Sequence, residues 1–332
     1  MTPTTLPPTL HARPMHAGDA AAWADLLAAA EEAARTGEHY DVEDLVEELA
    51  DPGVDHARDS LLVLEGELPV AYQILHRRRP DDRLWLVSEG TVRPSHRRRG
   101  VGAALIADGL RRAAEEDARY SMRVMGLDTG ATAAAERAGL VPVRWWSQMS
   151  RPMTASTTGS TTGPTTGLVA APLPDGLVLH TLGPDYDAAR WDEPLRAAHN
   201  AAFADHWGSS PVSAQAWAPT RTGSRSFRPA ASVAVCTPGG DVVGYVLSQE
   251  HVAETARTGR RDLWVLDVGT LRAWRGRGVA SAALAHVLAT ARDLGYDTAS
   301  LFVDTGNPTG ALGVYTRQGF RPVRRDVSYA TP

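Results

Sequence analysis

Residues 273–285 read AWRGRGVASAALA, and residues 95–107 read SHRRRGVGAALIA. In both stretches arginine and glycine stand directly before a run of small and apolar residues that is typical of a helix. The first backbone N–H groups of a helix have no partners, and the helix dipole makes the potential there positive. Glycine lets an anion approach the backbone closely, and arginine adds charge and paired donors. Each stretch therefore predicts either a phosphate or diphosphate site at the beginning of a helix, or a tight strand–helix turn with solvated arginines.

The two stretches belong to a repeat that spans most of the chain. EGTVRPSHRRRGVGAAL (89–105) aligns without gaps on DVGTLRAWRGRGVASAA (267–283), and ERAGLVPV (136–143) resembles TRQGFRPV (316–323). A repeat of this period indicates a duplicated domain. TASTTGSTTGPTTG (154–167) cannot form a core and reads as a flexible linker. We expect an N-terminal domain at 1–153, a linker at 154–167 and a C-terminal domain at 168–332.

Each half has the same predicted order of elements. A helix (20–35 or 187–204) precedes a hairpin (60–75 or 233–248), and a third strand (84–87 or 263–268) leads into the glycine-containing turn. The following helix has one buried face; another strand, a short helix and a final strand complete the half. Each half is therefore predicted to be a β-rich α/β unit.

Composition excludes several classes of protein. The 332-residue chain has a formal net charge of −5, all 34 of its basic residues are arginine, and it contains one cysteine. We expect no nucleic-acid partner, no membrane partner and no intrachain disulfide. The N-terminus has no apolar segment of signal-peptide length, and no apolar run is long enough to span a membrane, so a cytoplasmic location is expected. Without lysine the chain has no P-loop.

The Arg-x-x-Gly-x-Gly/Ala pattern resembles the acetyl-coenzyme-A signature of the GNAT superfamily of N-acyltransferases. DTGNPTGALGVYTRQGF (304–320) resembles the later motif of that family. The resemblance implies two tandem GNAT-like domains of the α/β (α+β) class, each a mixed, mostly antiparallel twisted sheet flanked by helices. It also implies acetyl-CoA as co-substrate, without a metal. The residues expected to bind it are Val268, Thr270, Arg275, Gly276, Arg277, Gly278, Val279, Ala280 and Asn307 in the second half, and Val92, Arg97, Gly100, Val101 and Gly102 in the first.

The two halves differ in this later motif. The second half has fourteen residues between Asp304 and Gly319, whereas the first has ten between Asp128 and Gly139. Counting back from the glycine places Ala135 where Tyr315 stands. We expect the second half to be catalytic and the first to be catalytically degenerate, with either a retained coenzyme-A-type ligand or a structural role.

The resemblance assigns Tyr315 as the general acid that protonates the departing thiolate. The amine must lose a proton, which a carboxylate could accept; each candidate carboxylate could instead be solvated or attract a cationic amine. Asp267, at the end of the strand before the turn, is one candidate for this base, and Glu250, just after the hairpin, is the second. In many family members the base lies a few residues earlier on this strand, where this chain has Trp264. Phe203, His206 and Trp207, from an aromatic-rich segment, are expected to contact the acceptor.

These features predict an N-acetyltransferase that transfers an acetyl group to a primary amine of a small molecule by direct attack in a ternary complex. One alternative keeps the family but takes a protein N-terminus or a lysine side chain as the acceptor. Another is a non-catalytic acyl-CoA-binding regulatory protein. The expected assembly is a monomer or a homodimer.

Overall fold

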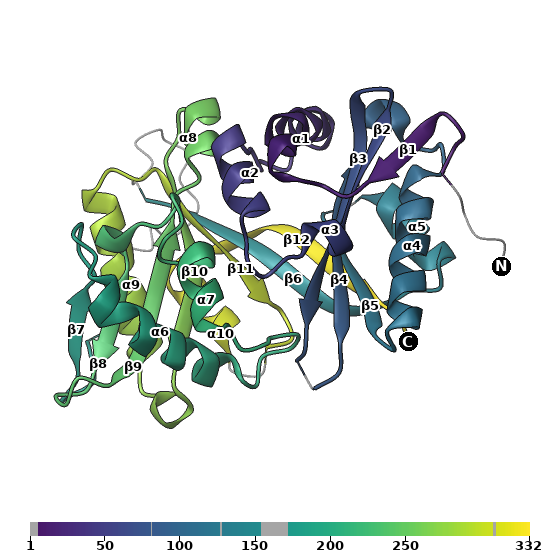
Figure 1. Ribbon diagram of the computed structural model, residues 1–332. Coiled ribbons are helices and arrows are strands. Elements are labelled where there is room, and N and C mark those ends of the chain that lie inside the picture. Colours follow the sequence, from purple (N-terminus) through teal and green to yellow (C-terminus); the bar gives the residue numbers. More distant parts are fainter. Residues whose placement is uncertain (1–5, 81, 127, 154–171, 308–309) are drawn as a thin grey trace. The chain divides into compact units, whose positions relative to one another are not determined.

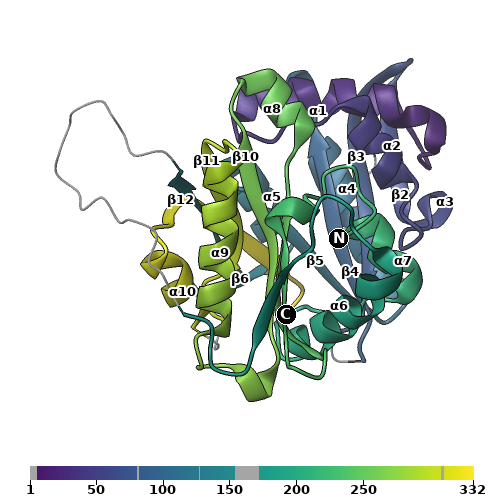
Figure 2. The same ribbon diagram turned by 90° about the vertical axis from the view of Figure 1, so that its left-hand side faces the viewer.

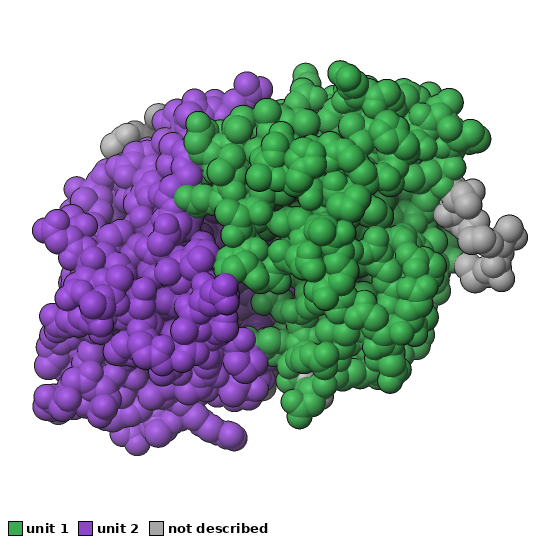
Figure 3. Space-filling view, viewed as in Figure 1, with its two compact units in different colours: residues 1–145, 208–210, 325–332 green, residues 146–207, 211–324 purple. Residues whose placement is uncertain are grey.

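The computed structural model describes residues 6–80, 82–126, 128–153, 172–307 and 310–332 (Figure 1). The chain forms two compact units, coloured separately in Figure 3. Unit 1 contains residues 1–145, 208–210 and 325–332, and unit 2 contains residues 146–207 and 211–324. The predicted linker at 154–167 lies outside the described residues.

Unit 1 is a sheet with helices, and its strands follow the spatial order β1-β2-β3-β4-β5-β12. Neighbouring strands pair antiparallel, except that β4 and β5 pair parallel. Its elements are β1 (Leu10–Arg13), α1 (Ala20–Ala34), α2 (Val42–Leu49), α3 (His56–Asp59), β2 (Ser60–Glu65), β3 (Leu68–Arg78), β4 (Trp85–Val92), α4 (Val101–Glu115), β5 (Arg119–Val124), α5 (Thr129–Arg137) and the end of β12 (Arg321–Ala330).

Unit 2 has the same plan, with the strand order β6-β11-β10-β9-β8-β7. Here β10 and β11 form the parallel pair, and the other neighbours are antiparallel. Its elements are most of β6 (Val141–Pro152), β7 (Val178–Thr181), α6 (Ala188–Phe203), α7 (Ala214–Thr220), β8 (Val233–Cys236), β9 (Val242–Gln249), α8 (Val252–Thr258), β10 (Asp262–Thr270), α9 (Val279–Asp293), β11 (Thr298–Asp304) and α10 (Ala311–Arg317). The predicted fold class, with mostly antiparallel sheets flanked by helices, is confirmed.

The final strand of each sequence half completes the sheet of the other half. Residues 146–152 of β6 pair with β11 in unit 2, and residues 327–330 of β12 pair with β5 in unit 1. The side chains explain this exchange: Met149 is fully buried in the core around α9, and Tyr329 is buried in the core around α4. The compact units therefore differ from the predicted division at 1–153 and 168–332.

Two hydrophobic cores cover the two faces of the unit 2 sheet. On one face, α9 and α10 pack on the strands (Figure 2). Leu284, Val287 and Leu288 of α9 are completely buried there. On the other face, α6 and α7 pack on β8 and β9 through Trp191, Leu195 and Trp217. Removing this apolar surface from water, at about 25 cal/mol per Å², fixes the strands and the turns that follow them.

The strand β10 separates from its parallel neighbour within unit 2. Pairing with β11 covers only 262–264 opposite 298–300, although β10 continues to Thr270. The register with β9 shifts between Val265 and Asp267, so Leu266 is the extra residue of a β-bulge. In unit 1, β4 also leaves β5 early, but the register of β3 and β4 is regular over all their paired residues. Both halves therefore have a parallel strand pair that separates early. Among the described β3–β4 and β9–β10 pairs, only β9–β10 of the second half also has a bulge next to this separation.

Candidate active site

A cavity of about 550 Å³ lies in unit 2 where β10 and β11 separate. One wall is the end of β10 and the turn that opens α9, and another is the end of β11 with α10. The C-terminal end of α6 and one residue of β6 close it further. Of the expected site residues, those lining the cavity are Phe203, His206, Val268, Thr270, Arg275, Gly276, Gly278, Val279, Ala280, Asn307 and Tyr315.

The turn before α9 presents unused backbone donors to this cavity. Gly276 and Gly278 have φ angles of 73° and 91°, in the left-handed region that favours glycine. In the described part of the chain, no acceptor is found for the amide N–H groups of residues 276 to 281. These donors at the N-terminus of a 15-residue helix match the diphosphate of coenzyme A, so the residues present fit acetyl-CoA.

The two arginines of this turn are engaged with the protein itself. The guanidinium of Arg275 donates to the Asp205 carboxylate at 2.6 Å, to the Ala202 carbonyl at 2.7 Å and to the Thr270 carbonyl at 3.3 Å. Arg277 stacks over the ring of Trp274, 5.1 Å from its centroid, and does not line the cavity. Arg275 therefore joins the turn to α6 and β10, whereas sequence reasoning expected both arginines to contact the cofactor.

Tyr315, on α10, is buried and lines the cavity. Within the described residues its hydroxyl has no hydrogen-bond partner, and its ring packs against Phe320 with centroids 6.2 Å apart. Burial, together with the negative charge of Asp267, raises the pKa of the Tyr315 hydroxyl well above its usual value. The raised pKa keeps the hydroxyl protonated at neutral pH, so the group carries a proton at the wall of the cavity.

Asp267 projects from β10 toward the α6 face and does not line the cavity. Its Oδ2 accepts a hydrogen bond from Arg221 at 2.8 Å and lies 3.7 Å from Nδ1 of His199. The same Nδ1 is 2.8 Å from the hydroxyl of Tyr245, and burial lowers the pKa of His199. Oδ1 of Asp267 accepts no hydrogen bond from any described residue, so this oxygen is available to a proton or a water.

Glu250, the second candidate base, is an ion-pair centre outside the cavity. Its carboxylate is 2.9 Å from Arg261 and 3.1 Å from Arg228, and it accepts a hydrogen bond from Tyr296 at 2.8 Å. Although burial raises the pKa of Glu250, these donors outweigh it and lower the pKa to about 2. A carboxylate so stabilised has little affinity for an amine proton at neutral pH, so the geometry favours Asp267.

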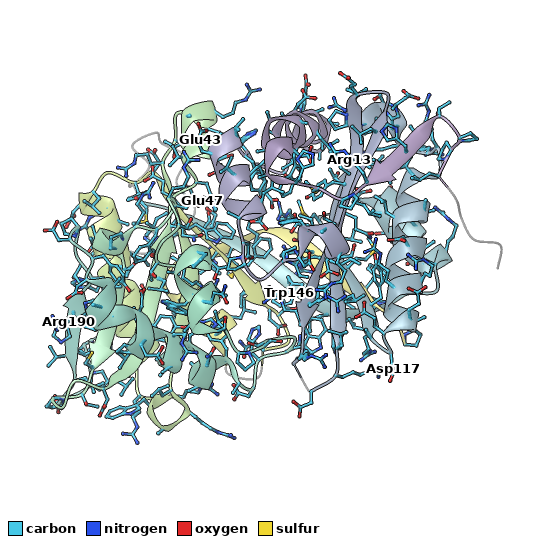
Figure 4. All side chains as sticks on the ribbon, viewed as in Figure 1. Arg13, Glu43, Glu47, Asp117, Trp146 and Arg190 are labelled. Atoms are coloured by element: carbon cyan, nitrogen blue, oxygen red, sulfur yellow. The ribbon has the colours of Figure 1, made fainter. Side chains whose placement is uncertain are left out.

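Two of the three residues expected from the aromatic-rich segment line the cavity. Phe203 and His206 line the cavity; Trp207 does not, but its ring lies 6.1 Å from that of Trp146. Trp146, labelled in Figure 4, comes from β6 and lines the cavity. Sequence reasoning missed it because the strand exchange is not visible in the local pattern. Other lining residues that it missed are Ala202, Asp205, Leu266, Trp274, Ser281, Phe302, Val303, Gly310, Ala311, Val314 and Arg317; Asp304, also in the wall, was noted only as a motif residue.

The first half keeps the glycine turn before its helix but lacks the tyrosine of the second half. Gly100 begins α4 with a φ of 86°, Val101 is buried, and Arg97 donates to the carbonyl of Val92 at 3.1 Å. Arg98 takes the left-handed conformation (φ 65°) that Gly276 occupies in the second half. Gly102 lies in the first turn of α4, where an added Cβ would meet Val92 at 3.7 Å. Ala135 is fully buried on α5, so no hydroxyl stands at the position of Tyr315.

Comparison with known proteins agrees with this geometry. The model of the acetyltransferase (GNAT) family matches residues 21–140 and 193–320. A mycothiol acetyltransferase of Tsukamurella paurometabola is 34% identical over 73% of this chain and 77% of its own. A mycothiol acetyltransferase of Nocardia farcinica is 32% identical over 92% of both chains.

Solved structures give the same result for the fold. A GCN5-related N-acetyltransferase from Sphaerobacter thermophilus superposes with a TM-score of 0.69 and 25% identity, covering 98% of this chain and 96% of that one. A tandem GNAT protein from the clavulanic acid biosynthesis pathway superposes with a TM-score of 0.66 and 20% identity. The match covers 97% of this chain and 98% of that one.

The chain therefore belongs to the GNAT acetyltransferase family, with two GNAT domains in tandem. It is an N-acetyltransferase that uses acetyl-CoA as the donor. None of the described helices is long and apolar enough to cross a membrane. The described residues contain no group of three or more His, Cys, Asp or Glu side chains placed to hold a metal ion.

Proposed function

We propose that the second half of the chain acetylates a primary amine of a small molecule by direct attack in a ternary complex. The observation that carries this proposal is the Tyr315 hydroxyl, which lines the same cavity as the turn at 276–281 and has no partner among the described residues. A protein that only binds acyl-CoA does not need a proton donor in that place.

Acetyl-CoA supplies an activated acetyl group as a thioester. The turn before α9 binds its diphosphate, and the edge of β10 from Leu266 to Thr270, which the described residues of β11 do not pair, binds the extended pantetheine arm as an added strand. A backbone N–H group of the same edge can donate to the thioester oxygen as negative charge develops there. Asn307 follows β11 and lines the same cavity, close to where the arm would pass.

The proton transfers follow from the two titratable groups near the bulge. As the amine nitrogen bonds to the acetyl carbon, the carbon–sulfur bond breaks and the thiolate takes the proton of Tyr315. Oδ1 of Asp267 accepts the proton that the amine loses, through a water because the carboxylate lies outside the cavity wall. Arg221 holds the carboxylate in place through its hydrogen bond to Oδ2, and the buried His199 lies 3.7 Å from the same oxygen.

The first half is proposed to be degenerate as a catalyst. Its third strand has no bulge over the described residues of β3 and β4, and Ala135 replaces the acid. It retains the turn at Gly100, which supports binding of a coenzyme-A-type ligand or a structural role.

Coenzyme A release, measured with a thiol reagent over a panel of amines, tests this function. Because two relatives are mycothiol acetyltransferases, the panel includes an amine acceptor of the mycothiol type. We expect amine-dependent release that Tyr315→Phe abolishes while acetyl-CoA still binds. Acetyl-CoA binding without release for any amine would instead support the regulatory alternative, and release with a lysine peptide alone would support a protein acceptor.

A further inference from the structure

Three aromatic side chains lie on one face of the unit 2 sheet. Trp264 on β10 is opposite Ser300 on β11 in the parallel register, and Phe302 follows Ser300 by two residues. Phe302 is opposite Gln148 on β6, and Trp146 precedes Gln148 by two. Residues paired across strands share a face, as do residues two apart, so the three rings form a diagonal over three strands. We call Trp264, Phe302 and Trp146 the aromatic diagonal.

The rings of the diagonal are not part of a hydrophobic core. Trp264 and Phe302 meet edge to face with centroids 5.6 Å apart, and each remains partly exposed. None of the three belongs to the described core clusters around α9 or α6. Large apolar rings that are kept out of the core and near a cavity are typical of ligand contacts.

Two of the three rings of the diagonal line the cavity, and Trp264 does not line it but contacts Phe302. Phe302 and Trp146 line the cavity, and so does Leu266, the bulge residue two positions after Trp264. Two residues of a strand span about 7 Å. A ring resting on Trp264 and Phe302 can therefore hold an amine at the bulge through a tether of two or three carbons.

The polar groups of this face nearest Trp264 are already used within the protein, whereas Gln148, opposite Phe302, and Asp304, opposite Trp146, share the face and stand outside this set. The Asp262 carboxylate accepts hydrogen bonds from Thr298 and, at 3.0 Å, from Ser300. Ser300 is also 3.1 Å from the hydroxyl of Ser150. Since these hydroxyls and this carboxylate satisfy one another, they are poorly placed to recognise the many hydroxyl groups of a sugar-like acceptor.

We propose that the acceptor is an amine that carries a planar apolar ring, and that Trp264 and Phe302 select it by packing against that ring. The inference rests on the proposed function, because it names the acceptor class for the same cavity. Trp264 acts here as a specificity-determining residue, which touches the ring and takes no part in proton transfer.

Three amines test the proposal with the full-length protein: 2-phenylethylamine, n-propylamine and glucosamine, each with acetyl-CoA. We expect kcat/KM for 2-phenylethylamine to exceed the values for the other two by about tenfold or more. Trp264→Ala is expected to remove most of that preference and to leave the KM for acetyl-CoA unchanged. Trp264→Phe should restore it, because a ring remains.

Trp145→Ala is the matched control. Trp145 is the neighbour of Trp146 on β6, is 49% exposed and has its side chain on the opposite face. This variant is expected to keep the preference for 2-phenylethylamine. Saturation-transfer NMR of 2-phenylethylamine on enzyme saturated with coenzyme A measures ring binding independently of turnover.

The outcomes separate the two claims. The inference is overturned if glucosamine is turned over as well as or better than 2-phenylethylamine, or if the preference survives Trp264→Ala. Acetyl transfer itself is not contradicted by either result. If no amine is turned over, the proposed function fails. In that case the aromatic site is still supported if wild type binds the ring and Trp264→Ala abolishes this binding. If wild type does not bind the ring, the aromatic site is overturned as well.

Discussion

Arg275 and Asp205, 70 residues apart in the chain, form an ion pair at the wall of the cavity, with Nη1 2.6 Å from Oδ2. The same guanidinium bonds to the carbonyls of Ala202 and Thr270. The arginine of the glycine-rich signature thus joins the turn to the end of α6 and to β10, and it is not free to act as the main phosphate donor that the motif predicts.

Removing either partner of this pair should loosen the turn. We expect Arg275→Ala and Asp205→Ala each to raise the KM for acetyl-CoA several-fold, and the double variant to be no worse than Arg275→Ala alone. Steady-state kinetics at fixed ionic strength measure the effect. If Arg275 were instead a direct phosphate ligand, Asp205→Ala would free it, and the KM would stay unchanged or fall.

Tyr315→Phe should lower kcat by about 100-fold or more, the usual contribution of a positioned general acid, without a change in acetyl-CoA affinity. Its thermal midpoint should stay close to that of wild type, because the hydroxyl has no described partner to lose. Tyr296→Phe is the matched control: it removes the hydrogen bond to Glu250, so it should cost about 1–3 kcal/mol of stability and leave kcat unchanged. An unaltered kcat in Tyr315→Phe would remove the acid assignment.

Asp267→Asn should lower kcat/KM by about 100-fold at neutral pH, because the amine must then lose its proton to solvent. The deficit should shrink as the pH rises toward the pKa of the amine, since more of the amine is already uncharged. A pH–rate profile of both proteins, with the same amine, measures this. A constant deficit at every pH would indicate that Asp267 only holds His199 and Arg221 in place.

Glu250→Gln separates stability from catalysis. The pKa of Glu250 is lowered to about 2 in the folded chain from an ordinary value near 4.5. A depressed carboxylate pKa stabilises the fold above pH 4.5, and that stability, about 3 kcal/mol, is lost as the pH falls from about 4.5 to about 2. We therefore expect the thermal midpoint of the variant to lie below that of wild type at pH 7, with a difference that shrinks below pH 4.5 and closes near pH 2.

The activity of Glu250→Gln at pH 7, measured well below its thermal midpoint, should be close to that of wild type. A loss of activity comparable to that of Asp267→Asn would contradict the structural role and return Glu250 to the list of bases.

The sequence predicted the fold class because it is encoded in local patterns that occur twice. Turn glycines before a helix and alternating apolar strands appear in both halves, and both are found in the structure. The exchange of β6 and β12 was not predictable, because a short strand does not specify its partner. That choice depends on where Met149 and Tyr329 find a core.

The site was predictable where a residue type and its spacing fix the chemistry. Gly276, Gly278, Asn307 and Tyr315 follow from such a motif and line one cavity, and their roles remain predictions. Partners distant in sequence were not predictable. Nothing near Arg275 indicates Asp205, and nothing near Glu250 indicates the two arginines that hold its proton affinity low.

We expect activity to depend on the second turn and not on the first, and a matched pair of variants measures this most directly. Gly278 and Gly100 have φ angles of 91° and 86°, and a Cβ added to either meets no atom within 4 Å. Glutamate at either position therefore carries the same backbone strain, about 1–2 kcal/mol, and the same charge. Gly278→Glu, however, places a carboxylate at the wall of the cavity in unit 2.

We predict that Gly278→Glu abolishes acetyl-CoA binding at that turn, measured by calorimetry, and lowers amine-dependent coenzyme A release at least 100-fold. Gly100→Glu should retain activity within about threefold of wild type. Equal losses in the two variants, or a loss confined to Gly100→Glu, would contradict the account.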